Sequence, residues 1–228
     1  MVWLLGLVAV SLAGDAGAGA VVRGAVTAAT GSRWASRVVA AASDWVAHAL
    51  VAVCAWMSVL AVGGQTESYQ ARLRQAAAAA GVAALIDTDR FVETMSLRLD
   101  ASSLLGRQAF WHCLPSIGAL AVVAYWAGRW QSHVIGRCVG VTRHVPAALA
   151  GIVLVAGLTH TLRDSARRGL WLLPPGDGLR TPPLGVLLSL AGQCGVAMAA
   201  GVVLRRIHAS SRPAPHARRT DTSVEHSI

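Results

Sequence analysis

Composition separates this chain from ordinary soluble proteins. Of its 228 residues, 20 are basic and all of these are Arg, against 11 acidic residues, which gives a formal charge of +9. Only 14% of the residues are charged and 54% are hydrophobic, whereas a soluble domain carries about 25% charged residues. Four Cys without a C-x-x-C pair also exclude a disulfide-stapled module. The sequence therefore predicts a membrane protein.

Four apolar runs are long enough to cross a bilayer, whose apolar core of about 30 Å needs about 20 residues of helix. They are Trp45–Val62, Leu114–Trp130, Val145–Leu162 and Leu184–Leu204. Ser43 and Asp44 precede the first run as a predicted N-cap, and Gly63 and Gly64 follow it. We therefore expect an all-α polytopic membrane protein with about four transmembrane helices.

The flanking segments divide the chain into three expected regions. Residues 1–44 contain the apolar stretch Val2–Ala13, which is too short to span and resembles the apolar region of a secretory signal, followed by small residues and Arg, as in a mitochondrial presequence. Residues 45–207 form the expected membrane domain. Residues 208–228 are polar and expected to be disordered. Four spans would leave both ends of the chain on one face, and the Arg-rich tail favours the cytosolic face.

The segment between the first two runs, residues 65–112, has an amphipathic pattern. At 100° per residue, one side collects Phe91, Val92, Met95, Leu99 and Phe110, which are the residues expected to insert into a membrane. The opposite side carries Glu93, Asp100 and Arg107, spaced seven residues apart. Such a helix either lies in the lipid headgroup region or packs its apolar side against protein, and the pattern does not separate these alternatives.

Several short motifs in this region and beyond it resemble the peroxin-11 family of peroxisomal membrane-elongation and division proteins. The motifs are Glu67–Arg74, Arg98–Ser102, Leu105–Gln108, Tyr125–Arg129, Leu162–Asp164, Pro182–Gly185 and Leu190–Gly192. The resemblance implies peroxisomal membrane elongation, with membrane lipid, homo-oligomers or a larger membrane complex, and the membrane-fission machinery as partners. The peroxisomal membrane is then the expected location, with the mitochondrial inner membrane and the secretory pathway as alternatives.

Two other functions stay open on the sequence: a small-solute pore or transporter, and a hydrophobic scaffold subunit of a larger membrane complex. A pore needs polar residues that converge within the spans, and these are scarce here. Arg205 and Arg206, directly beside the last run, are expected to anchor that helix at lipid headgroups. No aromatic residues are interleaved with the Arg of the tail, so nucleic-acid binding is not expected.

A few His and Cys residues have side chains that can bind a metal or a haem, but plain structural roles fit them better. His48 and His160 lie in predicted spans and could ligate a haem from facing helices, but each lies near a helix end and could simply reach the interface. His112 with Cys113, and His133 with Cys138 and His144, are too loosely spaced for a typical zinc site. We therefore expect no metal, no cofactor and no enzymatic activity.

Overall fold

A computed structural model describes residues 2–15, 18–64, 67–88, 110–139, 145–173 and 179–210. Its helices are α1 (Val2–Asp15), α2 (Ala18–Thr30), α3 (Arg33–Gly63), α4 (Tyr69–Ile86), the 3-10 turn η1 (Phe110–His112), α7 (Leu114–Val139), α8 (Val145–Arg168) and α9 (Gly185–Ser210). Within these ranges the only β pairing is one isolated bridge between Trp171 and Arg180. The prediction of an all-α protein is confirmed.

The longest helix, α3, begins earlier than the apolar run predicts. Its N-cap is Ser32, whose side chain accepts a hydrogen bond from the amide of Ala35, and it ends at Gly64 in the left-handed conformation. Residues 33–43 are rich in helix-forming Ala and Arg, so the helix continues upstream of the apolar run. The predicted cap at Ser43 and Asp44 is therefore wrong, and the expected division at residues 44/45 falls inside one helix.

The segment after α3 returns along α3 instead of staying at one surface. The 16 residues from His48 to Gly63 rise by about 23 Å and the 18 residues of α4 by about 27 Å, so α4 brings the chain back to the level of His48. Its small face, made of Ala76, Ala79 and Ala83, is buried, and Gln75 accepts a hydrogen bond from the indole of Trp56. Residues 69–86 therefore pack on protein.

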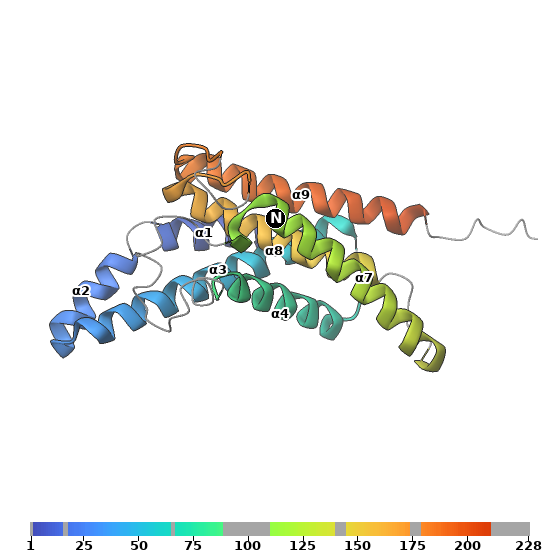
Figure 1. Cartoon of the computed structure of the whole chain (residues 1–228), viewed down its shortest axis with the longest axis horizontal. Helices are drawn as coiled ribbons and strands as arrows, with labels where there is room; N and C mark the ends of the chain where they lie inside the picture. The colour runs from blue at the N-terminus through green and yellow to red at the C-terminus, as the bar shows by residue number, and fades with distance from the viewer. Residues whose placement is uncertain are drawn as a thin grey trace, which may run out of the picture.

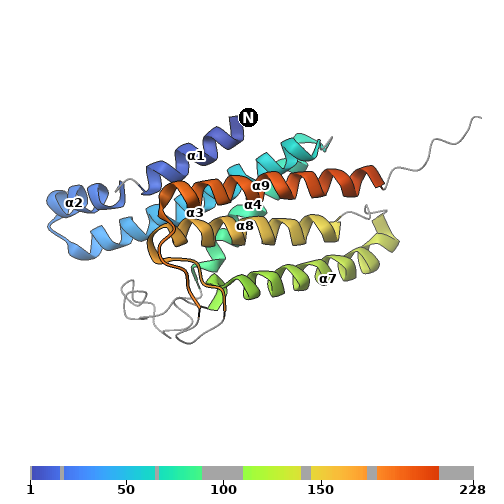
Figure 2. The same cartoon turned by 90° about the horizontal axis from the view of Figure 1, so that it is seen from above.

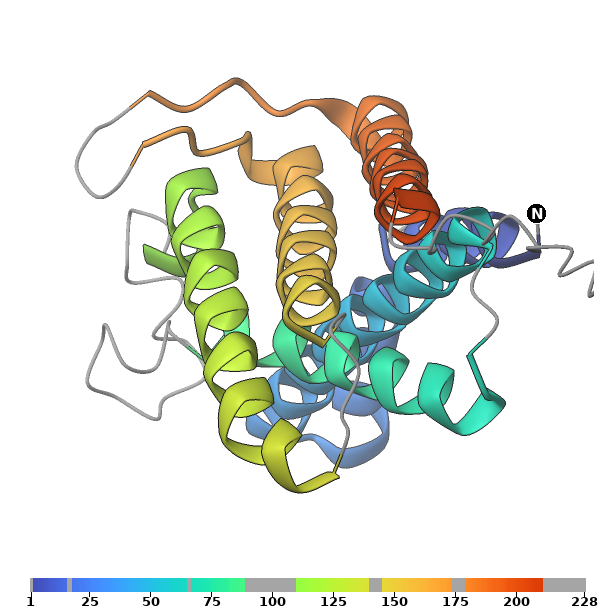
Figure 3. The same cartoon turned by 90° about the vertical axis from the view of Figure 1, so that its right-hand side faces the viewer.

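The three remaining long helices form one layer. Figure 2 shows α7, α8 and α9 side by side, and Figure 3 shows α3 and α4 lying across one side of that layer. The helices approach closely at glycines: a Cβ on Gly157 would lie 2.7 Å from Ile117, and one on Gly201 would lie 2.6 Å from Val62. Small residues thus set the spacing of these helices, as they do in membrane bundles.

Three helices in the described part of the chain are long and apolar enough to cross a membrane: α3 from Trp34, α8 from Pro146, and α9. Their lengths and composition indicate a membrane protein. The predicted count of four spans is not confirmed, because α7 is not among them. It carries Trp126, Arg129, Trp130 and His133, which lower its apolar character.

The amphipathic face predicted between the first two spans lies almost wholly outside the described residues. Phe91, Val92, Glu93, Met95, Leu99, Asp100 and Arg107 belong to that part of the chain, and Phe110 begins η1. Its insertion into lipid stays a prediction. Helix α1, by contrast, is described and packs against α3 and α9. Its Leu7 is fully buried and its Ser11 donates a hydrogen bond to Gln193.

One end of the bundle collects several helix ends, and we call it the Asp87 end. There α4 and α8 finish and α7 and α9 begin, while α2 and the first turns of α3 project beyond it (Figure 1). Helix α9 ends at the opposite end of the bundle. Three candidate spans would put the start of α3 and the end of α9 on opposite sides of a membrane. The arrangement of the helices agrees, because these two ends lie at opposite ends of the bundle.

This arrangement predicts a topology that differs from the one expected from four spans. In a chain whose native Cys are replaced by Ala, a single Cys at Thr30 and another at Ser210, both exposed, should react with a membrane-impermeant maleimide from opposite sides of sealed vesicles. Labelling of both positions from the same side would show that an even number of helices crosses. Labelling after detergent lysis is the control for reactivity.

Candidate metal centre

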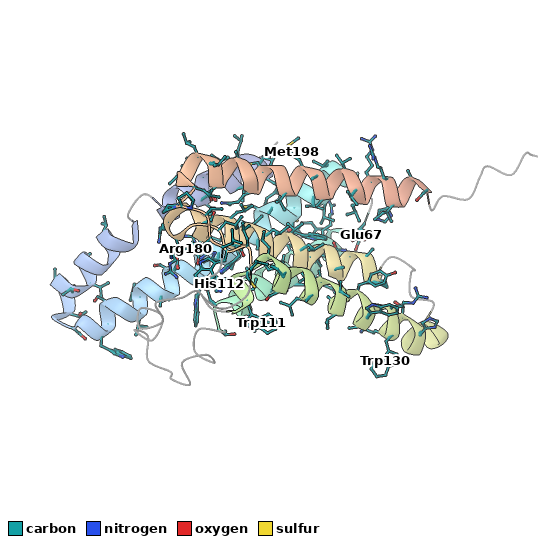
Figure 4. The ribbon with its side chains drawn as sticks, turned by 45° about the horizontal axis from the view of Figure 1, so that its top comes forward. Glu67, Trp111, His112, Trp130, Arg180 and Met198 are labelled. Carbon is teal, nitrogen blue, oxygen red and sulfur yellow. The ribbon has the colours of Figure 1, made fainter. Side chains whose placement is uncertain are left out.

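Three His and three Asp from different elements gather at the Asp87 end. Asp44 and His48 come from α3, Asp87 caps the end of α4, His112 ends η1, and His160 and Asp164 come from α8. Figure 4 places His112 inside the bundle, whereas Trp130 and Met198 point away from it. The cluster therefore unites residues that are up to 120 positions apart in the chain.

Asp87, His112 and His160 form a nearly equilateral triangle of donor atoms. The Nε2 atoms of His112 and His160 are 3.2 Å apart, and each lies 3.5 Å from Oδ1 of Asp87. A tetrahedral ion about 2.0–2.1 Å from each ligand separates the ligand atoms by about 3.4 Å. The triangle thus has the size of one face of a zinc coordination tetrahedron.

Asp164 connects this triangle to a second group of donors. Its Oδ2 lies 3.8 Å from Nε2 of His112, and its Oδ1 lies 3.3 Å from Nε2 of His48. The same His48 nitrogen is 3.8 Å from Oδ2 of Asp44. The rings of His48 and His160 stack with their centroids 3.8 Å apart, which leaves no room for a haem between them. Ligand atoms of His48, His160 and Asp164 all lie within 4.8 Å of one another.

The cluster is buried, and its polar atoms are not all satisfied by protein. His48, His112 and His160 are at most 1% exposed, and neither ring nitrogen of His48 makes a hydrogen bond to a described residue. Burial raises the pKa of Asp87, but hydrogen bonds with His112 and His160 and electrostatic interaction with His160 and His48 outweigh it, so its pKa lies well below the usual range. Buried ionisable groups of this kind are normally paired or bind a metal.

Arg163 adds a buried positive charge beside the cluster. It is 3% exposed, and its Nη2 lies 3.2 Å from Oδ1 of Asp44, the carboxylate that also contacts His48. Its Nε and Nη1 make no hydrogen bond to a described residue. Because a guanidinium stays charged when buried, these atoms are donors available to an anion.

Local structure explains why these side chains meet. Asp44 and His48, like His160 and Asp164, are four residues apart and therefore share one face of their helix. The connection from α8 to α9 folds back through hydrogen bonds between Leu170 and Thr181. The carbonyl of Trp171 in that connection accepts a hydrogen bond from the amide of Leu114, which fixes the start of α7 next to His112.

The sequence-predicted site residues lie elsewhere or were interpreted differently. Arg205 and Arg206 are exposed in the last turns of α9, where their contact with headgroups stays a prediction. His133 is exposed on α7, away from the cluster, and His144 lies outside the described residues. The structure unites His112 with His48 and His160, whereas the sequence paired only His48 with His160 and grouped His112 with Cys113.

Sequence reasoning missed all three carboxylates and Arg163. Asp44 was interpreted as a helix cap, and Asp164 as part of a motif. One signal could have found four of the six residues of the cluster: Asp44 directly precedes the first apolar run, four residues before His48, and Asp164 follows the third run, four residues after His160. One pair lies at the start of its span and the other at the end of its span. If the two helices are antiparallel, both pairs lie at the same end of the bundle and can form one site. No comparable local signal marks Asp87.

Three proteins named Transmembrane protein 267 are similar to this chain. The mouse protein is 28% identical over 144 residues, which is 63% of this chain and 59% of the mouse protein. The cattle protein is 26% identical over the same shares, and the zebrafish protein is 26% identical over 59% of this chain and 54% of its own length. The match thus spans less than two thirds of each relative. No family model and no solved structure matches the chain.

These comparisons correct the family resemblance. The relatives are named as transmembrane proteins, and nothing among them points to the peroxin-11 family, so that prediction is wrong. The quoted motifs were short and rich in common residues, and short apolar motifs recur by chance in membrane helices of similar composition. The relatives' names and the apolar helices together support a membrane protein, without specifying its organelle.

Proposed function

We propose that this chain is an integral membrane protein that binds a divalent transition metal, Zn²⁺ by preference, and uses it to activate water for hydrolysis. The observation that carries this proposal is the buried triangle of Asp87, His112 and His160, with donor atoms 3.2–3.5 Å apart. Two imidazoles and one carboxylate are a ligand set that hydrolytic zinc sites use.

The number of ligands favours a reactive site over a structural one. Structural zinc sites are closed by four protein ligands, whereas hydrolytic sites keep a position for water. Here three donors form a face of matching size, and Oδ2 of Asp164 is the next oxygen, 3.8 Å from His112. A bound Zn²⁺ would lower the pKa of its water to about 7 and supply hydroxide near neutral pH.

The other functions considered have no comparable support. Membrane shaping depends on the face from Phe91 to Phe110, which lies almost wholly outside the described residues. Pore and scaffold functions stay alternatives that no finding favours. The expectation that the chain is not an enzyme is untested. We propose metal-assisted hydrolysis instead because the buried donors have the geometry of a metal site.

Metal content tests the proposal directly. The full chain, purified in detergent and dialysed against Zn²⁺ and then against metal-free buffer, should retain Zn²⁺ when measured by plasma mass spectrometry. His112→Gln and Asp87→Asn should each lower the affinity of the triangle for Zn²⁺ by about tenfold to a hundredfold or more. Loss of a residue that only supports a metal ligand already costs about that much. His133→Ala, which removes an exposed His far from the cluster, is the matched control.

Two outcomes would contradict the proposal. Wild-type protein that retains no Zn²⁺, Mn²⁺ or Fe²⁺ above the level of a chelated sample would show that the cluster is only structural. Equal metal content in His112→Gln, Asp87→Asn and wild type would place the metal elsewhere. Helical content by circular dichroism identifies any variant that fails to fold, and such a variant is replaced by His160→Gln.

A further inference from the structure

His48 and Asp44 lie on the side of Asp164 that faces away from the triangle, and they form a second group of possible metal ligands. His48 is fully buried, and its Nε2 lies 3.3 Å from Asp164 and 3.8 Å from Asp44. Neither of its ring nitrogens makes a hydrogen bond to a described residue. A buried imidazole without hydrogen bonds is costly, and a metal ion would satisfy it.

Asp164 has the geometry of a bridging carboxylate. Its Oδ1 faces His48 and its Oδ2 faces His112, so its two oxygens serve two different donor groups. Two ions, each bound to one oxygen of such a carboxylate, lie about 3.5–4 Å apart, as in two-metal hydrolases. Since one imidazole nitrogen binds one ion, Nε2 of His160 belongs to the triangle. The second ion then has His48 and Asp164 as ligands, and Asp44 lies 3.8 Å from His48 on the same side.

We propose that Asp164 bridges two divalent metal ions and that this two-metal centre, together with Arg163, binds and hydrolyses phosphate monoesters. This inference rests on the proposed function and adds to it a second ion and a class of substrate. Because Asp164 is shared, the first ion has four protein ligands and binds its water as a fifth, as catalytic zinc sites allow. Two ions and Arg163 bring enough positive charge to bind a dianionic phosphate.

Arg163 favours phosphate because its guanidinium stays charged when buried and keeps N–H donors for anionic oxygens. Its Nη2 contacts Asp44, while its Nε and Nη1 make no hydrogen bond to a described residue. Asp44 is 37% exposed and Asp164 13%, so the side of the second ion is the more exposed side of the centre. That side lies beside α8's last turn, where Arg167 and Arg168 follow.

The reaction balances without a further reagent. A metal-bound hydroxide attacks phosphorus and forms a new P–O bond, while the ester P–O bond breaks. The leaving alkoxide takes a proton from water, and inorganic phosphate is released. No atom is oxidised or reduced. The two ions stabilise the attacking and the leaving oxygen, which is the established use of such pairs.

The ion count separates this inference from the proposed function. Full-length protein should retain two Zn²⁺ per chain, and His48→Gln and Asp44→Asn should each retain one. His133→Ala should retain two. One ion in wild type, unchanged by His48→Gln, would overturn the second site and leave the proposed function intact. No ion in wild type would overturn both.

The bridge has its own spectroscopic test. Protein loaded with two Co²⁺ ions should show magnetic coupling in electron paramagnetic resonance, because the ions share one carboxylate. Asp164→Asn should lose that coupling together with the second ion. Two Co²⁺ ions per chain that behave as isolated centres in wild type would overturn the bridge, since the ions would then lie apart.

Phosphate binding is tested with inorganic phosphate as the probe and hydrolysis with two substrates. Phosphate should change the visible spectrum of the Co²⁺ protein, and Arg163→Gln should weaken its binding about tenfold to a hundredfold while two ions remain. Release of inorganic phosphate is then measured from phosphatidic acid in mixed micelles and from glycerol 3-phosphate in solution. Activity on either supports phosphate monoesters and identifies the source as lipid or soluble. No phosphate binding and no release from either substrate would overturn the substrate class.

Discussion

Removing the metal with a chelator should lower the stability of the folded chain by about 3–4 kcal/mol, relative to protein in Zn²⁺ at several hundred times its dissociation constant. The ligands come from the end of α4, from η1 and from α8, so one ion ties together three elements that are distant in the chain. Without it, buried imidazoles and carboxylates remain close together in an apolar bundle. The free-energy cost of removing these polar groups from water is then not offset by bonds to a metal.

Thermal unfolding in detergent, followed by circular dichroism, measures this effect. For a chain of this size the expected stability loss corresponds to a fall of about 5–15 °C in the unfolding midpoint. Restoring Zn²⁺ should restore the midpoint, and Mg²⁺ should not, because Mg²⁺ prefers oxygen ligands. His133→Ala should respond as wild type does. Two results together would show that the cluster is stable without metal. The chelator would leave the unfolding midpoint of wild type unchanged, and Asp87→Asn would have the same midpoint as wild type.

Acidification should release the metal before it unfolds the protein. Imidazole must lose its proton to bind a metal, so the affinity of a two-His site should fall by at least about tenfold as the pH is lowered from 7 to about 4. Asp87 remains ionised over this range, because its pKa lies well below the usual value. That carboxylate contributes stability above its unfolded-state pKa and loses it only as the pH falls further, through its lowered folded-state pKa. Protonation of the imidazole ligands, not of Asp87, therefore controls release.

Competition with a fluorescent Zn²⁺ chelator at several pH values measures the affinity, and circular dichroism at each pH confirms that the chain is still folded. The steepness of the curve reports how many protons replace the metal. His112→Gln should give a shallower curve, because one proton-binding ligand is gone. A curve that is as steep in His112→Gln as in wild type would show that carboxylates alone hold the ion.

Local sequence determined much of the fold. The apolar runs at Trp45–Val62, Val145–Leu162 and Leu184–Leu204 each lie in a long helix, because hydropathy and helix propensity act over neighbouring residues. The extent of α3 upstream to Arg33 and the return of α4 were missed. An Ala-rich helix with Arg72 and Arg74 near its start does not look like a crossing segment, and only packing against α3 buries its small face.

Two parts of the candidate site were already visible in the sequence: the pairs Asp44 with His48 and His160 with Asp164, each on one helix face. Their meeting was decided by tertiary structure, because α3 and α8 pack so that the start of one apolar run lies beside the end of the other. Asp87 and His112 join them only because α4 brings the chain back and the α8–α9 connection fixes the start of α7. Residue chemistry and helix positions follow from local sequence. Distances of 3–4 Å between donors on separate elements depend on how whole helices pack, which no local pattern encodes.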